Sequence, residues 1–348
     1  MELNFRSDNE APAAPEIMQA IIKANQGTAW SYATDSWSDR LDSAFSDLFE
    51  TRTTVLPLST GTAANSIALA CLSPPWGSVY CHEGAHILND ECGAPEFFGN
   101  GLRLVGIAGT NGKLEPAELR NAIRRNEGHG VHSYLPSALS ITQSTEAGTV
   151  YLEDELSTLS GAASEFGMAC HMDGARFANA VAGLGCSPAQ ISWKCGVNML
   201  SFGAGKNGCM GAEALLIFGE TGLRERAERL RKRSGHLLSK MRFVSAQLLS
   251  YIENNRWLDY AAHANGQATR FAAAVTEHPE ARLEYTADAN EVFVRWNPGG
   301  FKALTEAGVQ FFLQPGHDDL ARFVFSFQTP EAETEALCQA LAKIRAAA

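Results

Sequence analysis

Long apolar runs are missing from this sequence: none approaches the roughly 18 residues that a membrane helix needs, so we expect no membrane-spanning segment. The first residues contain no basic stretch followed by an apolar one, so we expect no secretory signal. The eight cysteines form no CxxC pair and have no regular spacing, which argues against a zinc site and a disulfide framework. These absences predict a cytoplasmic protein without a bound metal.

Positive charge is also scarce. The 28 lysines and arginines are outnumbered by 39 aspartates and glutamates, for a net charge of −11. Such a balance argues against a nucleic acid or an anionic membrane surface as the main partner, so a small molecule is expected. Hydrophobic residues make up 45% of the 348 positions, which is enough for a sizeable core and roughly two domains.

Hydrophobic patterning indicates an α/β fold. From about residue 53 to residue 215, short apolar runs alternate with helical patterns, which is typical of βαβ units that build a mostly parallel sheet. We expect strands at 55–58, 102–107, 138–142, 168–172, 198–202 and 213–218, and helices at 65–72, 116–125 and 154–166. Sustained helical periodicity over 221–255 predicts one long helix or two in tandem.

The C-terminal part of the chain has a different pattern. A helix at 261–274, strands at 282–285, 291–296 and 322–327, and a terminal helix from Glu331 predict a small α+β domain. We therefore divide the chain into an N-terminal segment (1–45), a large domain (46–250) and a small domain (251–348).

The strongest local signal for function is a lysine in a glycine-rich turn. Lys206 lies in the segment SFGAGKNGCMG (201–211), directly after a predicted strand. A lysine flanked in this way stays close to the backbone and cannot easily extend into solvent. A desolvated amine has a depressed pKa and becomes nucleophilic, as in Schiff-base lysines. The alternative is an exposed lysine on a flexible loop.

A carboxylate follows another predicted strand, in the segment HMDGAR (171–176). In open α/β sheets ligands bind beyond the carboxyl ends of the strands, so Asp173 and Lys206 could converge on one crevice. An enzyme that uses pyridoxal phosphate (PLP) needs such a pair: the lysine binds the cofactor, and the carboxylate keeps its pyridine nitrogen protonated, so that the ring acts as an electron sink. Asp173 could instead cap the helix that follows.

A third segment, STGTAAN (59–65), lies between a predicted strand and a predicted helix. Small residues, hydroxyl groups and free backbone N–H groups at a helix N-terminus form an anion site suited to a phosphate. The segment is not a Walker A loop, because no Lys followed by Ser or Thr comes after it. Turns of this kind often only cap a helix, so the order of the three segments matters more than any one of them.

Taken in chain order, five segments resemble the low-specificity L-threonine aldolases, which are PLP-dependent enzymes of fold type I. The segments are SDN (7–9), GTAAN (61–65), the stretch from Ala85-His86 to Phe98, HMDGAR (171–176) and GKNG (205–208). The resemblance runs from Ser7 to Arg322, and Lys-Asn-Gly after the active-site strand points to a bacterial branch. It implies a large PLP-binding domain with a mostly parallel sheet flanked by helices, a small α+β C-terminal domain, and an N-terminal segment that contributes to the active site and to an interface.

The resemblance also implies roles for the cofactor-binding residues. Lys206 corresponds to the Schiff-base lysine and Asp173 to the partner of the pyridine nitrogen. Gly61 and Thr62 correspond to the residues that hold the phosphate. His86 matches the family's histidine that lies over the cofactor ring, a role that suits a flat and titratable imidazole.

Substrate-binding residues are implied in the same way. Ser7, Arg176 and Arg322 match the residues that hold the α-carboxylate of the substrate, for which a guanidinium fork is well shaped. Arg176 is also expected to lie against the cofactor. Judged on the residues alone, Arg176 could pair with Asp173 instead, and Arg322, which opens an apolar strand, could simply be solvated. His132 matches a second histidine near the substrate hydroxyl.

Two further groups are candidates. Arg231, Lys232 and Arg233 form a basic run that could reach the cofactor phosphate, also across a subunit boundary, although a charged run on a helix is usually a solvated face. Tyr32 and Asp35 lie in an N-terminal loop of the kind that lines the entrance to the site in this family.

The expected reaction is the cleavage of L-threonine, L-allo-threonine or related L-β-hydroxy-α-amino acids such as phenylserine to glycine and an aldehyde. His86, His132 or a water could be the base that removes the β-hydroxyl proton. An aminotransferase, a racemase or a β-eliminating lyase starts from the same bound amino acid, and a binding protein could keep the fold without the chemistry. The resemblance also implies a homodimer or homotetramer with active sites at the dimer interface.

Overall fold

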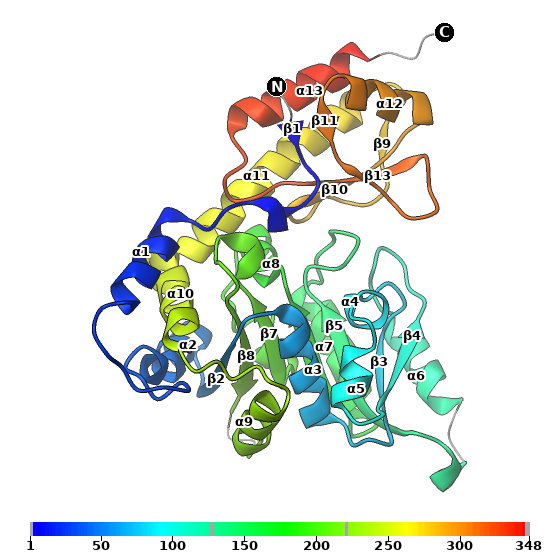
Figure 1. The fold of residues 1–348 in the computed structure, drawn as a ribbon. Helices are drawn as coiled ribbons and strands as arrows, with labels where there is room; N and C mark the ends of the chain where they lie inside the picture. The colour runs from blue at the N-terminus through cyan, green and yellow to red at the C-terminus, as the bar shows by residue number, and fades with distance from the viewer. Residues whose placement is uncertain (1–2, 126–128, 220–221, 345–348) are drawn as a thin grey trace.

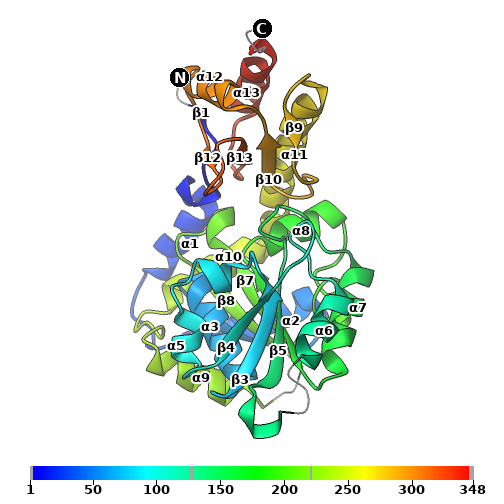
Figure 2. The same cartoon turned by 90° about the vertical axis from the view of Figure 1, so that its right-hand side faces the viewer.

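The larger part of the molecule is built on a seven-stranded sheet with helices on both faces (Figures 1 and 2). The computed structural model describes residues 3–125, 129–219 and 222–344. In space the strands lie in the order β2 (Thr53–Leu58), β8 (Glu213–Phe218), β7 (Met199–Gly203), β6 (Ala169–Gly174), β5 (Leu135–Thr142), β3 (Gly77–His82) and β4 (Arg103–Ile107). Neighbours are parallel except that β8 runs antiparallel to both β2 and β7. The mostly parallel sheet predicted from the sequence is confirmed.

Helices cover this sheet on both sides. The helices on one face are α3 (Gly61–Leu72), α5 (Ala94–Phe98) and α9 (Arg224–Arg233), and those on the other are α6 (Pro116–Arg124) and α7 (Glu153–Ser164) (Figure 2). Strand β7 is therefore buried along its whole length, and β6 along all but its first residue. Burial on both faces explains why these strands read as continuous apolar runs and not as alternating ones.

A smaller antiparallel sheet lies apart from the main one (Figure 1). Its strands lie in the order β12 (Phe312–Leu313), β13 (Leu320–Val324), β10 (Glu291–Arg295) and β9 (Arg282–Leu283), and the helices beside it are α11 (Arg256–Glu277), α12 (Pro298–Glu306) and α13 (Glu331–Lys343). Because α11 also contacts α8 (Phe177–Leu184), this one long helix joins the two parts. Strand β1 (Leu3–Asn4) pairs with β11 (Val309–Gln310), so the N-terminal segment lies partly against the smaller sheet.

Some elements differ from the sequence-based prediction. Of the two alternatives predicted for residues 221–255, two helices in tandem is confirmed: α9 and α10 (Arg242–Ile252) are separate, and the chain turns between them at Gly235 with a φ of 81°. Strand β13 starts at Leu320, so the prediction that Arg322 opens a strand is wrong; Arg322 lies in the middle, opposite Phe293 and Phe312. The prediction also missed the helices α1 (Pro15–Ala24), α2 (Leu41–Phe49), α4 (His86–Asn89), α5 and α12, the strand β3, and the short strands β1, β11 and β12.

The topology decides which segments meet. Strands β2, β5, β6 and β7 run parallel to one another and end at the same edge of the sheet, where the antiparallel β8 begins. The segments that follow β2, β6 and β7 are the three that carried the functional signals, so they meet at this edge. Within the described ranges, no helix is both long and apolar enough to cross a membrane.

Candidate active site

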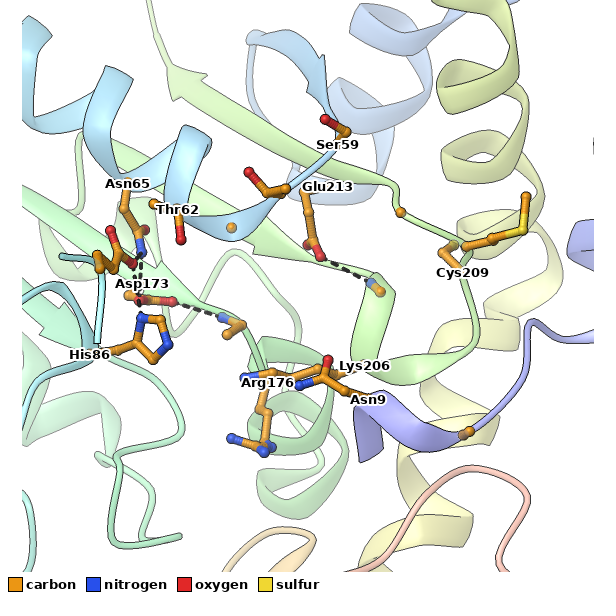
Figure 3. A pocket seen from close by; sticks show the side chains of 18 of the residues that line it. Asn9, Ser59, Thr62, Asn65, His86, Asp173, Arg176, Lys206, Cys209 and Glu213 are labelled. Atoms are coloured by element: carbon orange, nitrogen blue, oxygen red, sulfur yellow. Dashed lines mark hydrogen bonds and ion pairs between the residues drawn. The ribbon is translucent and has the colours of Figure 1, made fainter. Parts of the chain in front are cut away.

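A cavity of about 660 Å³ opens at the edge where the parallel strands end (Figure 3). The residues predicted to bind a cofactor all line it: Gly61, Thr62, His86, Asp173, Arg176 and Lys206. Its other polar lining residues are Asn9, Ser59, Thr60, Asn65, Glu91, Thr142, Ser144, Glu146 and Glu213. Residues that are far apart in the sequence thus share one site because of the strand order.

Lys206 lies in a short 3₁₀ turn, η5 (Gly205–Asn207), directly after β7. The next residue fixes this turn: the Asn207 side-chain amide donates to Tyr251 Oη at 2.7 Å and to the Trp257 carbonyl at 2.8 Å. Gly208 follows with a φ of 111°, and a Cβ there would lie 3.1 Å from the Tyr260 ring. The turn is therefore held against aromatic side chains, unlike a flexible surface loop.

A buried carboxylate holds the other side of this turn. Glu213, the first residue of β8, accepts hydrogen bonds from the N–H groups of Ala204 at 2.9 Å and of Gly205 at 3.3 Å. Burial raises the pKa of Glu213 to about 7, although these N–H groups and the Lys206 amine oppose the rise. Glu213 thus positions the lysine turn from within the cavity wall.

Asp173 lies near the end of β6 and is almost fully buried. Its Oδ1 accepts from the N–H of Ala175 at 3.0 Å, and its Oδ2 accepts from Asn65 Nδ2 at 2.8 Å (Figure 3). The following helix, α8, begins at Phe177 with Arg176 as its N-cap and has no side-chain cap bond. The alternative that Asp173 caps this helix is therefore wrong.

Asn65, on α3, connects Asp173 to a second carboxylate. Its Nδ2 also donates to Glu91 Oε1 at 2.8 Å, and the same oxygen lies 2.9 Å from His86 Nδ1. The hydrogen bond to Glu91 raises the pKa of His86 above its usual value, against a smaller opposing effect of burial. His86 is thereby fixed by Nδ1, which leaves Nε2 for a ligand in the cavity.

The N-terminus of α3 borders the same cavity. Thr60 caps the helix, since its Oγ1 accepts from the N–H of Ala63 at 3.2 Å, and the first turn contains no acidic residue. A Cβ added to Gly61 would meet nothing within 4 Å, so the chain itself leaves space beside the helix end. Unpaired N–H groups, the helix dipole and this space together suit a phosphate.

Arg176 is held by two carboxylates from distant parts of the chain. Its Nε and Nη2 donate to Asp8 at 2.8 and 3.0 Å as a bidentate pair, and its Nη1 lies 3.1 Å from Glu291 Oε2. Asp8 belongs to η1 (Asp8–Glu10), and Glu291 begins β10 of the smaller sheet. The alternative pairing of Arg176 with Asp173 is therefore wrong. The cluster instead ties the N-terminal segment to both sheets.

Arg322 joins this cluster through Glu291. Its Nη1 lies 3.5 Å from Glu291 Oε1, and its side chain is 27% exposed, so it is not simply solvated. Ser7 caps η1 by accepting from the N–H of Asn9 at 3.2 Å. In the described chain neither Ser7 nor Arg322 lines the cavity itself. Ser7 is, however, the neighbour in sequence of Asp8, which pairs with Arg176. Arg322 contacts Glu291, the other carboxylate that Arg176 contacts.

His132 lies elsewhere. It belongs to η3 (Gly130–His132), which precedes β5 and therefore lies at the edge of the sheet opposite the cavity. Its side chain is exposed. Within this one chain, the residues that line the cavity do not include it.

The basic run on α9 is split between two environments. Arg231 is buried, and its Nη1 donates to the carbonyl of Pro57 at 3.4 Å. Pro57 lies just before segment 59–65, which is predicted to bind the phosphate. Lys232 and Arg233 are exposed, which agrees with a solvated face. Burial lowers the pKa of Arg231, and its Nε has no hydrogen-bond partner among the described residues.

The two N-terminal candidates lie outside the cavity lining of the described chain. Tyr32 is exposed and its ring lies under Lys232, whose Nζ is 4.7 Å from the ring centroid. Asp35 is buried and accepts from the N–H groups of Trp37 and Ser38, so it stabilises the local turn.

Five acidic and amide residues that the sequence analysis did not assign help to build the site. Asp8, Asn65 and Glu91 stand inside segments that carried the family resemblance, although nothing in the sequence showed their partners. Glu213 and Glu291 each open an apolar strand. A charged residue at the start of a buried strand was the one signal that could have identified them.

Comparison with known proteins identifies the family of the chain. The family model described as beta-eliminating lyase matches residues 4–297. The low-specificity L-threonine aldolase of Pseudomonas sp. (strain NCIMB 10558) is 42% identical over 334 residues, which cover 96% of this chain and 95% of that protein. The low-specificity L-threonine aldolase of Pseudomonas aeruginosa is 43% identical over 326 residues, which cover 93% of each.

The fold is shared as well. The structure of Leishmania major threonine aldolase matches with a TM-score of 0.91 and 26% identity, over 97% of this chain and 98% of that one. The predicted fold type I architecture and the resemblance carried by the five segments are both confirmed. Because the family model covers most of the chain and the relatives cover nearly all of it, the protein belongs to the beta-eliminating lyase family, in its low-specificity L-threonine aldolase branch.

Proposed function

We propose that this protein cleaves L-threonine and L-allo-threonine, and related L-β-hydroxy-α-amino acids such as phenylserine, to glycine and an aldehyde. The observation that carries the proposal is the meeting of Lys206, Asp173 and Arg176 in one cavity, in a chain 42% and 43% identical to two low-specificity L-threonine aldolases. A binding protein without the chemistry would not need these three side chains together.

The family depends on PLP, and we infer that PLP binds in this cavity. Lys206 offers an amine for a Schiff base, Asp173 offers a carboxylate for the ring nitrogen, and the space beside Gly61 at the end of α3 suits the phosphate. Ser144 Oγ also belongs to a cavity residue and is buried without a hydrogen-bond partner among the described residues, as expected of a ligand-binding group. When bound, PLP supplies an electron sink for the electron pair released at the substrate Cα.

The chain's own residues then have distinct tasks. Asp173 would hold a proton at the ring nitrogen, and His86, whose Nδ1 is bonded to Glu91, would stack on the ring. Arg176, with Arg322 and Ser7, binds the α-carboxylate of the amino acid. By orienting the substrate, these groups select the Cα–Cβ bond for cleavage.

The function is tested by measuring aldehyde and glycine release from L-threonine, L-allo-threonine and L-phenylserine with added PLP. Wild-type protein is compared with Lys206→Ala and with Lys194→Ala, whose lysine is exposed and paired with Glu50. We expect Lys206→Ala to lose both the Schiff-base absorbance and turnover, whereas Lys194→Ala keeps both. Wild-type protein that binds PLP but releases no aldehyde from any of the three would favour an aminotransferase, a racemase or a β-eliminating lyase.

We also propose that the protein assembles as a homodimer or homotetramer with active sites at the dimer interface. The N–H of Leu135 donates to the Trp76 carbonyl, and Trp76, Tyr134 and Leu135 are all exposed, so apolar side chains are exposed close to His132 in the chain. An exposed surface of this kind suits contact with a second copy. His132 can act on a substrate only if that contact brings it to the cavity of another chain.

The assembly is tested by light scattering and by mixing two inactive variants. If His132 acts in the cavity of another copy, Lys206→Ala and His132→Asn chains that are refolded together regain part of the activity. Folded mixed oligomers that stay inactive would contradict this role of His132. The three-part division of the chain at residues 45 and 250, and the cytoplasmic location, stay predictions.

A further inference from the structure

One carboxyl group of the cavity has no task in the site described above. Asp173 uses both oxygens in hydrogen bonds to Asn65 and Ala175, and Glu213 uses both to hold the lysine turn. Glu146 also lines the cavity, but its one hydrogen bond in the described part of the chain is from the N–H of His86 to Oε1, at 3.3 Å. Its second oxygen therefore stays available for a ligand.

Glu146 lies where a substrate would be bound. Its segment follows β5, and charged groups from four other elements act on it: Asp173 from β6, Lys206 from η5, Arg176 from the start of α8 and Glu291 from β10. Burial raises the pKa of Glu146 to about 7, Asp173 and Glu291 reinforce the rise, and Lys206 and Arg176 oppose it. Glu146, Lys206 and Arg176 line the same cavity, so a substrate bound there would be within reach of all three side chains.

His86 is less suited to accept a proton. Its Nδ1 is bonded to Glu91, and this contact raises the pKa of His86, so that the ring stays protonated over more of the neutral range. An imidazolium ion donates protons but has no free lone pair to accept one. His132 lies at the opposite edge of the sheet. Glu91 Oε2 also lacks a hydrogen-bond partner among the described residues, but this atom is buried, and the other oxygen of Glu91 already contacts Asn65 and His86. Glu146 is therefore the carboxylate that lines the cavity with an available oxygen and no other task.

We propose that Glu146 takes the proton from the β-hydroxyl group of the substrate during cleavage of the Cα–Cβ bond. This role rests on the proposed aldolase function. The O–H bond breaks and its electron pair forms the second bond of the aldehyde carbonyl, while the electron pair of the Cα–Cβ bond stays with the glycine fragment. Glu146 gains one proton and Cα later takes up one, so no oxidant or reductant is needed.

The test compares Glu146→Gln with wild-type protein in turnover of L-threonine and in binding of glycine. Glutamine keeps the shape but cannot accept the proton, so we expect kcat to fall about 100-fold, within the range for loss of a general base. KM should change by no more than about threefold, because the carboxylate-binding arginines are untouched. Glycine has no β-hydroxyl, so the absorbance change that glycine causes in PLP-loaded protein should keep the same midpoint.

The pH profile gives a second readout. A general base must be ionised, so wild-type kcat should fall as the pH drops through about 7, and this acid limb should be absent from Glu146→Gln. Glu146→Asp, which keeps a carboxyl group, should retain the limb with reduced kcat. Glu213→Gln should also retain it, although Glu213 titrates in the same range. Glu277→Gln, on the exposed side of α11, serves as the surface control and should match wild type.

The outcomes separate the two proposals. A Glu146→Gln protein that turns over within about threefold of wild type, or that keeps the acid limb, overturns the role of Glu146 and leaves the aldolase function intact. A Glu146→Gln protein with altered PLP or glycine binding assigns Glu146 a structural role and also overturns it. Wild-type protein that binds PLP and glycine but cleaves no β-hydroxy amino acid overturns the aldolase function, and the role of Glu146 with it.

Discussion

The two sides of the cavity balance charge in opposite ways. On the strand-end side, defined by Asn65, His86, Glu91 and Asp173, two carboxylates share one amide and one histidine. The other side is a cluster of Asp8, Arg176, Glu291 and Arg322, of which Arg176 lines the cavity; it is called the interdomain side because it connects the two sheets. Here two carboxylates face two guanidinium groups. The first side has negative charge left for a ligand, whereas the second is neutral before any ligand binds.

This difference separates binding from folding. A side that needs a cationic group of a ligand adds to stability mainly when the ligand is present. A buried cluster that is neutral by itself holds the fold together with or without a ligand, because removing one partner leaves an uncompensated buried charge. Substitutions on the interdomain side should therefore alter the cofactor-free protein, and substitutions on the strand-end side should alter mainly the loaded one.

The largest effect is expected for Asp8→Asn, on the interdomain side. Burial alone would raise the pKa of Asp8, but Arg176 and Lys206 outweigh it and hold this pKa below its usual value. Breaking a buried pair of this kind costs about 3–5 kcal/mol, so the free energy of unfolding should fall by that amount with and without PLP. Urea unfolding measures it.

Glu50→Gln is the matched control for Asp8→Asn, because its ion pair with Lys194 is exposed. It should leave the unfolding curve unchanged. If Asp8→Asn were equally silent without PLP, the interdomain cluster would not be part of the folding core, and the contrast between the two sides would fail.

The next effect in size is expected for Asp173→Asn, on the strand-end side. The amide keeps the size of the side chain but cannot hold a proton at the ring nitrogen, so turnover should fall about 100-fold to 1,000-fold, as for loss of other preorganised electrostatic groups. PLP affinity, measured by absorbance titration, should weaken as well. The unfolding midpoint of the cofactor-free protein should stay close to wild type, and a large drop there would remove the distinction between the sides.

The strand-end side was accessible from the sequence because its signals are local. A lysine among glycines, a carboxylate after an apolar run and a helix start rich in small residues each reflect one turn of backbone, and parallel strand order alone brings such turns together. The same local patterns also predicted approximately where most strands begin and end. It missed β3, GSVYCH, because Ser78 and His82 break its apolar run although the strand is mostly buried.

The interdomain side was not accessible in this way. Arg176 could be recognised by family resemblance, but its partner Asp8 is 168 positions away, and Asp8 meets Asn290 across 282 positions. No periodicity relates such residues, because their contact depends on how the smaller sheet and the N-terminal segment pack on the main sheet. The location of His132 illustrates the same limit, since a motif match does not state which edge of a sheet a residue occupies.

A third prediction uses acid to separate the two sides. His171 lies two residues before Asp173 on β6 and is buried between the hydroxyl groups of Ser140 and Ser201. Burial lowers the pKa of His171 to about 4. The unfolded chain, with a histidine pKa near 6.5, takes up a proton first as the pH falls. The contribution of His171 to stability should therefore decrease between pH 6.5 and 4, by about 3 kcal/mol at most, while Glu146 and Glu213, with their raised pKa values, contribute in the opposite direction.

His171→Gln should lose this contribution, so the stability of the variant relative to wild type should rise as the pH falls from 6.5 to 4, which is measured by urea unfolding at a series of pH values. The contribution of Asp8 has the opposite kind of shift: it is complete above the usual carboxyl pKa near 4 and is lost only at lower pH. Asp8→Asn should consequently keep the pH dependence of the wild-type protein between pH 6.5 and 4. The same slope in wild type and His171→Gln would show that another group titrates there.

The smallest effect is expected for Arg322→Lys, at the outer end of the interdomain side. Arg322 is partly exposed and meets Glu291 at 3.5 Å, so its replacement should barely change unfolding. Lysine keeps the charge but lacks the planar fork, and loss of one charge-assisted hydrogen bond to the α-carboxylate should raise KM for L-threonine about tenfold, with a smaller change in kcat. Arg295→Lys, on β10 beside Glu284 and Asp319, is the matched control and should leave KM unchanged. If Arg322→Lys changed the free energy of unfolding but not KM, Arg322 would contribute to folding alone. Arg176 would then be the one arginine on this side that contributes both to folding and to substrate binding.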